Sequence, residues 1–255
     1  MTVEIEIRRA NPYGPLGLSV SLVIAMLLAC LYGTLLAGAA ALVGTALSGW
    51  SATLGFVRSL HAGGGDRASA LFLYSAGIAF YVAIAASILT LARFRAGTDW
   101  RRLLALPVER PWWRDRIYWA LVASGILYGA GASAALSELY PASKGWFTLE
   151  PGVVSLALTF VLVVVAAPIT EEIMFRGWIY TSLRFRFSAL VSVVVSALLF
   201  ANAHYESSHL YALAVFPVGL LLGVVRERTG TLWATVSLHA LYNFSGWLLT
   251  ALGIG

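Results

Sequence analysis

The sequence is poor in charged residues and almost free of cysteine and lysine. Only 11% of its 255 residues are Asp, Glu, Lys or Arg, whereas about 25% is usual in a soluble domain. Hydrophobic residues make up 60% of the chain, and no charge occurs between residues 10 and 57. The one cysteine, Cys30, excludes an intrachain disulfide. This composition excludes a soluble domain and predicts an all-α fold, a polytopic bundle of transmembrane helices.

The apolar runs divide the chain into seven predicted membrane spans. A crossing needs about 20 residues. The spans are expected at about residues 16–46, 68–92, 117–137, from 152 onward, 188–203, 208–225 and 231–250. An eighth span also fits, because the uncharged stretch 10–57 is long enough for two crossings.

The basic residues are concentrated in one set of loops. Seven arginines lie between residues 93 and 116, and pairs follow at Arg184/Arg186 and Arg226/Arg228. The positive-inside rule places these loops in the cytoplasm, with the N-terminus inside as well if 10–57 is one span. The net charge of +5 therefore indicates a lipid bilayer as partner and no nucleic acid. Arginine outnumbers lysine 16 to 1, which is typical of a GC-rich bacterial genome and favours a bacterial cytoplasmic membrane as the location.

Two adjacent glutamates, Glu171 and Glu172, follow a long uncharged run. A charged side chain at membrane depth costs at least ~2.5 kcal/mol, so such groups are candidate functional residues. Glu172 is four residues before Arg176 and can pair with it along one helix face. Glu171 points about 100° away and is left free to face a cavity. A free buried carboxylate beside another is suited to act as a general base.

Two more pairs have the same spacing of four residues, Phe200/His204 and His239/Asn243. Counted from a predicted turn at Ser188, Glu172 and His204 each lie 16 residues away, which is ~24 Å of helix. The three pairs are therefore expected to converge on one buried pocket. Each pair alone also has a structural explanation: an ion pair, an interfacial histidine or a hydrogen bond between helices.

In this order, the three motifs resemble the CAAX protease and bacteriocin-processing (CPBP, or Abi) family, which includes the type II CAAX prenyl endopeptidases. The resemblance covers about residues 150–245. It implies that residues 146–255 form a catalytic helical core, whereas residues 1–145 are N-terminal transmembrane helices without motifs. It also implies an intramembrane endopeptidase in which a glutamate activates a water molecule.

The resemblance assigns a role to each motif residue. Glu171 is expected to be the general base, with His204 sharing the water that it activates. His239 and Asn243 are expected to stabilise the tetrahedral oxyanion. Supporting roles fall to Glu172, Arg176 and Phe200: the charged pair holds the site in place and the phenylalanine packs around it.

Other mechanisms and functions fit the same residues. Glu171, His204 and His239 are zinc-ligand types, so a zinc-dependent intramembrane metallopeptidase is the alternative mechanism. The HExxH helix typical of zinc peptidases is absent, and no cofactor is expected. A non-catalytic membrane scaffold, acting as an immunity or assembly subunit, and a transporter with a proton relay are further alternatives. The expected substrate is a membrane-embedded or membrane-anchored peptide or protein.

Overall fold

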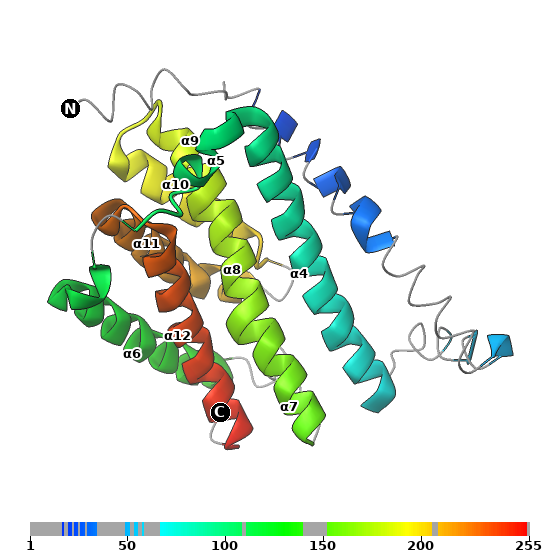
Figure 1. Cartoon of the computed structure of the whole chain (residues 1–255). Helices are drawn as coiled ribbons and strands as arrows, with labels where there is room; N and C mark the ends of the chain where they lie inside the picture. Colours follow the sequence, from blue (N-terminus) through cyan, green and yellow to red (C-terminus); the bar gives the residue numbers. More distant parts are fainter. Residues whose placement is uncertain are drawn as a thin grey trace.

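The computed structural model describes residues 67–108, 111–139, 152–205 and 209–253, together with scattered residues between 17 and 58. Within these ranges the chain is mostly helical and contains no strand, so the predicted all-α membrane bundle is confirmed (Figure 1). The predicted first span, 16–46, falls largely outside the described residues. Whether the chain has seven or eight spans therefore stays a prediction.

The described ranges contain long helices joined by short connections. The first part comprises α4 (Arg67–Ala96), η1 (Gly97–Asp99), α5 (Trp100–Leu103), η2 (Trp112–Arg114) and α6 (Arg116–Leu139). A continuous helical stretch follows, made of α7 (Val153–Phe160), η3 (Val161–Ala166), α8 (Ala167–Glu172), η4 (Ile173–Ile179) and α9 (Tyr180–Arg184). The chain then forms α10 (Ala189–Asn202), α11 (His209–Thr229) and α12 (Leu232–Ala251).

Among the described residues, four segments are long and apolar enough to cross a membrane. They are Leu71–Leu103, Arg116–Leu136, Val153–Arg184 and Leu210–Thr229. Helices also occupy the predicted spans 188–203 and 231–250, but α10 has only 14 residues and α12 carries a histidine and an asparagine in its interior. These two helices are therefore less apolar or shorter than an isolated crossing requires.

The stretch from α7 to α9 runs through the bundle between α4 and α12 (Figure 1). α10 and α11 pack behind this stretch and close against each other. A glycine on α11 allows the two helices to approach so closely. A Cβ added at Gly219 of α11 would lie 3.1 Å from the Cα of Ala197 and 3.2 Å from its carbonyl oxygen. The backbone of α10 therefore occupies the space that a side chain at Gly219 would need.

The loops expected in the cytoplasm meet at one end of the bundle. The guanidinium of Arg228 lies 2.9 Å from the carboxylate of Asp115, and Arg184 lies 2.9 Å from Glu227. The hydrogen bond from Arg228 holds the pKa of Asp115 below its usual range. The amide of Leu232, at the start of α12, donates to the carbonyl of Ala105 at 2.8 Å. These contacts agree with one common side for the three basic segments.

The close contact of α10 and α11 gives a testable expectation. Gly219→Ala should lower the free energy of unfolding by about 1–3 kcal/mol, because backbone atoms of Ala197 cannot move aside as a flexible side chain would. Thermal unfolding of the purified protein in detergent measures this. Gly246→Ala is the matched control, since nothing lies within 4 Å of an added Cβ there. Equal stability of the two variants would contradict the packing described.

Candidate active site

Glu172 and Arg176 form the buried ion pair that their spacing predicts. The guanidinium Nη1 lies 2.9 Å from the Glu172 Oε1, and both side chains are 0% exposed. Arg176 also donates from Nη2 to the carbonyl of Gly219 in α11, at 2.9 Å. The ring of Phe200 covers the guanidinium, with its centroid 4.5 Å from Cζ. The cation is thus surrounded by a carboxylate, a carbonyl and an aromatic face.

The same carboxylate orients His239 of α12. The Nδ1 of His239 lies 3.0 Å from Oε1 of Glu172, so an ionised Glu172 requires a proton on that nitrogen. The opposite nitrogen, Nε2, then faces the neighbouring Glu171, with 3.9 Å between Nε2 and Oε2. When a carboxylate bonds one ring nitrogen of a histidine, it fixes the role of the other nitrogen. This arrangement is common where a histidine has a chemical function.

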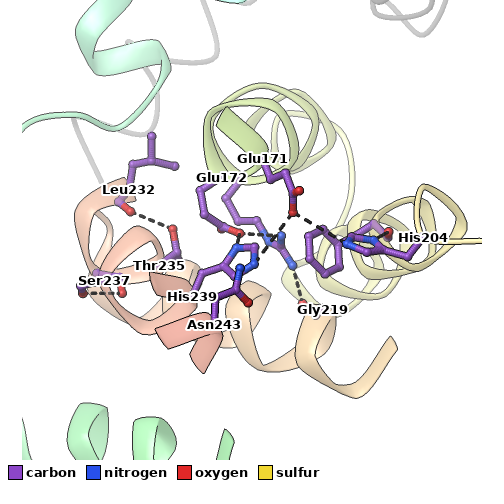
Figure 2. A network of polar contacts seen from close by, with 12 residues as sticks. Glu171, Glu172, His204, Gly219, Leu232, Thr235, Ser237, His239 and Asn243 are labelled. Carbon is purple, nitrogen blue, oxygen red and sulfur yellow. Dashed lines mark hydrogen bonds and ion pairs between the residues drawn. The ribbon is translucent and has the colours of Figure 1, made fainter. Parts of the chain in front are cut away.

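His204 is oriented in a similar way from the other side. Its Nδ1 lies 2.8 Å from the carbonyl oxygen of Phe200, and a carbonyl can only accept, so Nδ1 is the donor. Its Nε2 lies 3.9 Å from Oε2 of Glu171, the same separation as for His239. Figure 2 shows His204 and His239 near the two glutamates. The ring of Phe200 contacts both imidazoles, with centroid distances of 4.7 Å to His204 and 5.7 Å to His239.

Glu171 is held through its second oxygen by a residue that the motifs do not reveal. The hydroxyl of Tyr81, in α4, donates to Oε1 of Glu171 at 3.0 Å. The hydroxyl of Thr170 donates to the carbonyl of Tyr81, also at 3.0 Å. The sequence does carry one signal for this contact. Tyr81 lies near the middle of a span, midway between Arg67 and Arg93, whereas tyrosine is usually enriched at the membrane interface.

Asn243 lies one helical turn beyond His239, but its side chain bonds to the backbone of another helical segment. Its Nδ2 donates to the carbonyl of Val163 in η3, at 2.9 Å. The expected role of Asn243 as an oxyanion donor therefore stays a prediction. Phe200 lies where packing was expected, 1% exposed and in ring contact with Phe175, His204 and His239.

Oε2 of Glu171 faces Nε2 of His204 and Nε2 of His239, each across a gap of 3.9 Å. A separation of 3.9 Å is too long for a direct hydrogen bond, yet one water oxygen can bond to Glu171 and to a histidine across it. The side chains of Glu171 and His204 are 11% and 18% exposed, so neither is completely buried. Among the residues described, no group of three or more His, Cys, Asp and Glu side chains is arranged to hold a metal ion.

Comparison with known proteins identifies the family. The family profile described as type II CAAX prenyl endopeptidase Rce1-like matches residues 152–245, which include both glutamates, both histidines and Asn243. The chain belongs to this Rce1-like family. At the level of the family, it is therefore a multi-pass intramembrane protease of the CAAX type, with a lipid bilayer around it and a peptide as substrate.

A second comparison found a bacterial relative of unassigned activity. An uncharacterized 24.3 kDa protein of Escherichia coli is 30% identical over 146 residues, which cover 55% of this chain and 67% of that protein. No solved structure matches the chain. The profile match lies wholly C-terminal to Tyr81, so the contact of α4 with Glu171 comes from a part of the chain outside it.

The buried ion pair predicts an unequal response to two arginine variants. Arg176→Ala should lower the free energy of unfolding by about 3–5 kcal/mol, because it leaves Glu172 charged and buried. Arg184→Ala, the control, removes a pair whose side chains are about one-third exposed and should cost no more than about 1 kcal/mol. The two variants are compared by thermal unfolding in detergent and by the amount of each protein that accumulates in membranes. If Arg176→Ala is as stable as Arg184→Ala, the pair does not hold the site together.

Proposed function

We propose that this chain is an intramembrane endopeptidase in which Glu171 activates a water molecule to hydrolyse a peptide bond. The observation that carries the proposal is the equal distance of 3.9 Å from Oε2 of Glu171 to Nε2 of His204 and of His239. Three groups able to bond a water oxygen converge on one gap at membrane depth. Because Tyr81 occupies the other oxygen of Glu171, Oε2 is the atom turned toward that gap.

The proposed reaction follows from these positions. The Glu171 carboxylate takes a proton from the water while the resulting hydroxide attacks the scissile carbonyl carbon. The carbonyl oxygen becomes an oxyanion. When the tetrahedral intermediate collapses, the C–N bond breaks and the protonated Glu171 returns its proton to the leaving amine. His204 bonds the attacking water through Nε2 and so fixes its direction.

The charge of Glu172 gives His239 a different role from His204. Glu172 holds the Nδ1 side of the His239 ring, and in the proposed mechanism His239 donates from Nε2 to the oxyanion, a step that requires a proton on both ring nitrogens. A donor of this kind facing the oxyanion lowers the energy of the transition state. His204 has a neutral carbonyl as its partner instead. The two histidines thus differ in what holds their rings, which suits one to the water and the other to the oxyanion.

For the substrate we propose a membrane-embedded or membrane-anchored peptide segment. The family description names prenylated CAAX ends, a class of peptide that is held at the bilayer. A substrate held at the bilayer suits a site whose residues lie on membrane-spanning helices. The arginine-rich loops and the Escherichia coli relative support a bacterial cytoplasmic membrane as the location.

The role of Glu171 can be tested by an isosteric change. Glu171→Gln keeps the shape of the side chain but cannot take a proton, so cleavage should fall by at least ~10²–10⁴-fold while the protein still accumulates. Membrane proteomes of cells producing either form are compared for new peptide termini, and a peptide spanning such a terminus is then assayed. Glu227→Gln, at the bundle end, is the matched control and should keep full activity. Unchanged termini with Glu171→Gln would remove Glu171 from the base role.

The same proposal predicts that cleavage needs no added metal. A positioned glutamate and histidine can activate water without a Lewis acid, so treatment with a chelator should leave the rate within about twofold of the untreated enzyme. The control is a known zinc peptidase in the same detergent. Loss of activity on chelation, with recovery on adding zinc, would favour the metallopeptidase mechanism.

A further inference from the structure

The helical stretch that carries Glu171 departs from α-helical hydrogen bonding just before the glutamates. Val161–Ala166 is π-helical, with hydrogen bonds that reach back five residues. The amide of Ala167 follows this pattern and donates to the carbonyl of Leu162. The next amide in the same pattern would come from residue 168 and would reach the carbonyl of Val163.

Residue 168 is a proline, which has no amide hydrogen. The carbonyl of Val163 therefore loses the donor that the π-helical pattern would supply. A backbone carbonyl without a partner is costly inside a membrane, where water does not replace the missing bond. Prolines are tolerated within spanning helices where a neighbouring helix supplies the missing contact.

The side chain of Asn243 supplies that contact. Its Nδ2 lies 2.9 Å from the carbonyl oxygen of Val163, and it reaches η3 from α12. Pro168 is three residues before Glu171, and Asn243 is four residues after His239. One hydrogen bond thus joins the segment that leads into Glu171 to the helix that carries His239.

We infer that Asn243 is a positioning residue whose amide replaces the missing N–H of Pro168 and thereby sets the distance between Glu171 and His239. The inference rests on the proposed function, because it explains how that pair of catalytic groups is kept in register. An asparagine amide has two N–H groups, so the bond to Val163 uses one of them. The dependence of cleavage on Asn243 is then carried by the Val163 carbonyl.

Pro168→Ala provides the decisive background, because alanine restores an N–H at residue 168. Four proteins are compared: wild type, Asn243→Ala, Pro168→Ala and the double variant. In the proline background, Asn243→Ala should lower the melting temperature by about 5 °C, the effect of one unpaired buried carbonyl. In the alanine background, the same change should lower it by no more than about 1 °C. This measurement requires no substrate.

Activity gives the second reading. Asn243→Ala should reduce kcat at least tenfold with KM within twofold, and the double variant should recover to within about threefold of Pro168→Ala. Ser245→Ala is the matched control on α12, since its hydroxyl donates to the carbonyl of Tyr242 on its own helix. Its effect should be the same in both backgrounds.

The outcomes separate this inference from the proposed function. Equal losses from Asn243→Ala in both backgrounds, in melting temperature and in kcat, would overturn the inference and leave Asn243 acting directly on substrate. If Asn243→Ala accumulates only together with Pro168→Ala, that rescue supports the inference; failure of both to accumulate overturns it. A third outcome is that Asn243→Ala lowers the melting temperature only in the proline background while the Glu171→Gln protein remains active. That result would support the link between Asn243 and Val163 and reject the glutamate mechanism.

Discussion

A single carboxylate oxygen, Oε1 of Glu172, accepts hydrogen bonds from Arg176 on its own helical stretch and from His239 on α12. Arg176 in turn bonds to the Gly219 carbonyl of α11 and lies under the Phe200 ring of α10. Four parts of the bundle are therefore organised around one buried charge pair. In a medium without water, each of these contacts replaces solvation that the charges have lost.

The two adjacent glutamates occupy contrasting environments although they differ by one position in the chain. Glu172 is 0% exposed and fixed by an arginine and a histidine, whereas Glu171 retains 11% exposure and one oxygen turned toward the gap. The rotation of about 100° between successive helical residues produces this difference. The fixed carboxylate of Glu172 is suited to orient a histidine. The accessible carboxylate of Glu171 is suited to exchange protons.

The spacing of four residues was sufficient to predict the Glu172–Arg176 pair, because both side chains belong to one helix. Depth counting from Ser188 also indicated that His204 would lie close to the glutamates. The contact of Tyr81 with Glu171 was missed, since it depends on how α4 packs and involves no motif. The bond from Asn243 to Val163 could not be predicted either, because a backbone carbonyl carries no sequence signature and the π-helical register became apparent only in three dimensions. The first predicted span lies mostly outside the described residues, and α10 and α12 were counted as spans although polar residues or short length make them atypical.

The position of Glu172 and Arg176 on one helix has a consequence for biogenesis. Their ion pair can form within the segment Val153–Arg184 as it enters the bilayer, before any later helix has been synthesised, and this reduces the cost of inserting two charges. The contacts with Gly219 and His239 can be added only when α11 and α12 have followed. The order of synthesis therefore delays completion of the site until the last helix is in place. A partly inserted chain would already have Glu172 paired with Arg176 but would lack His239.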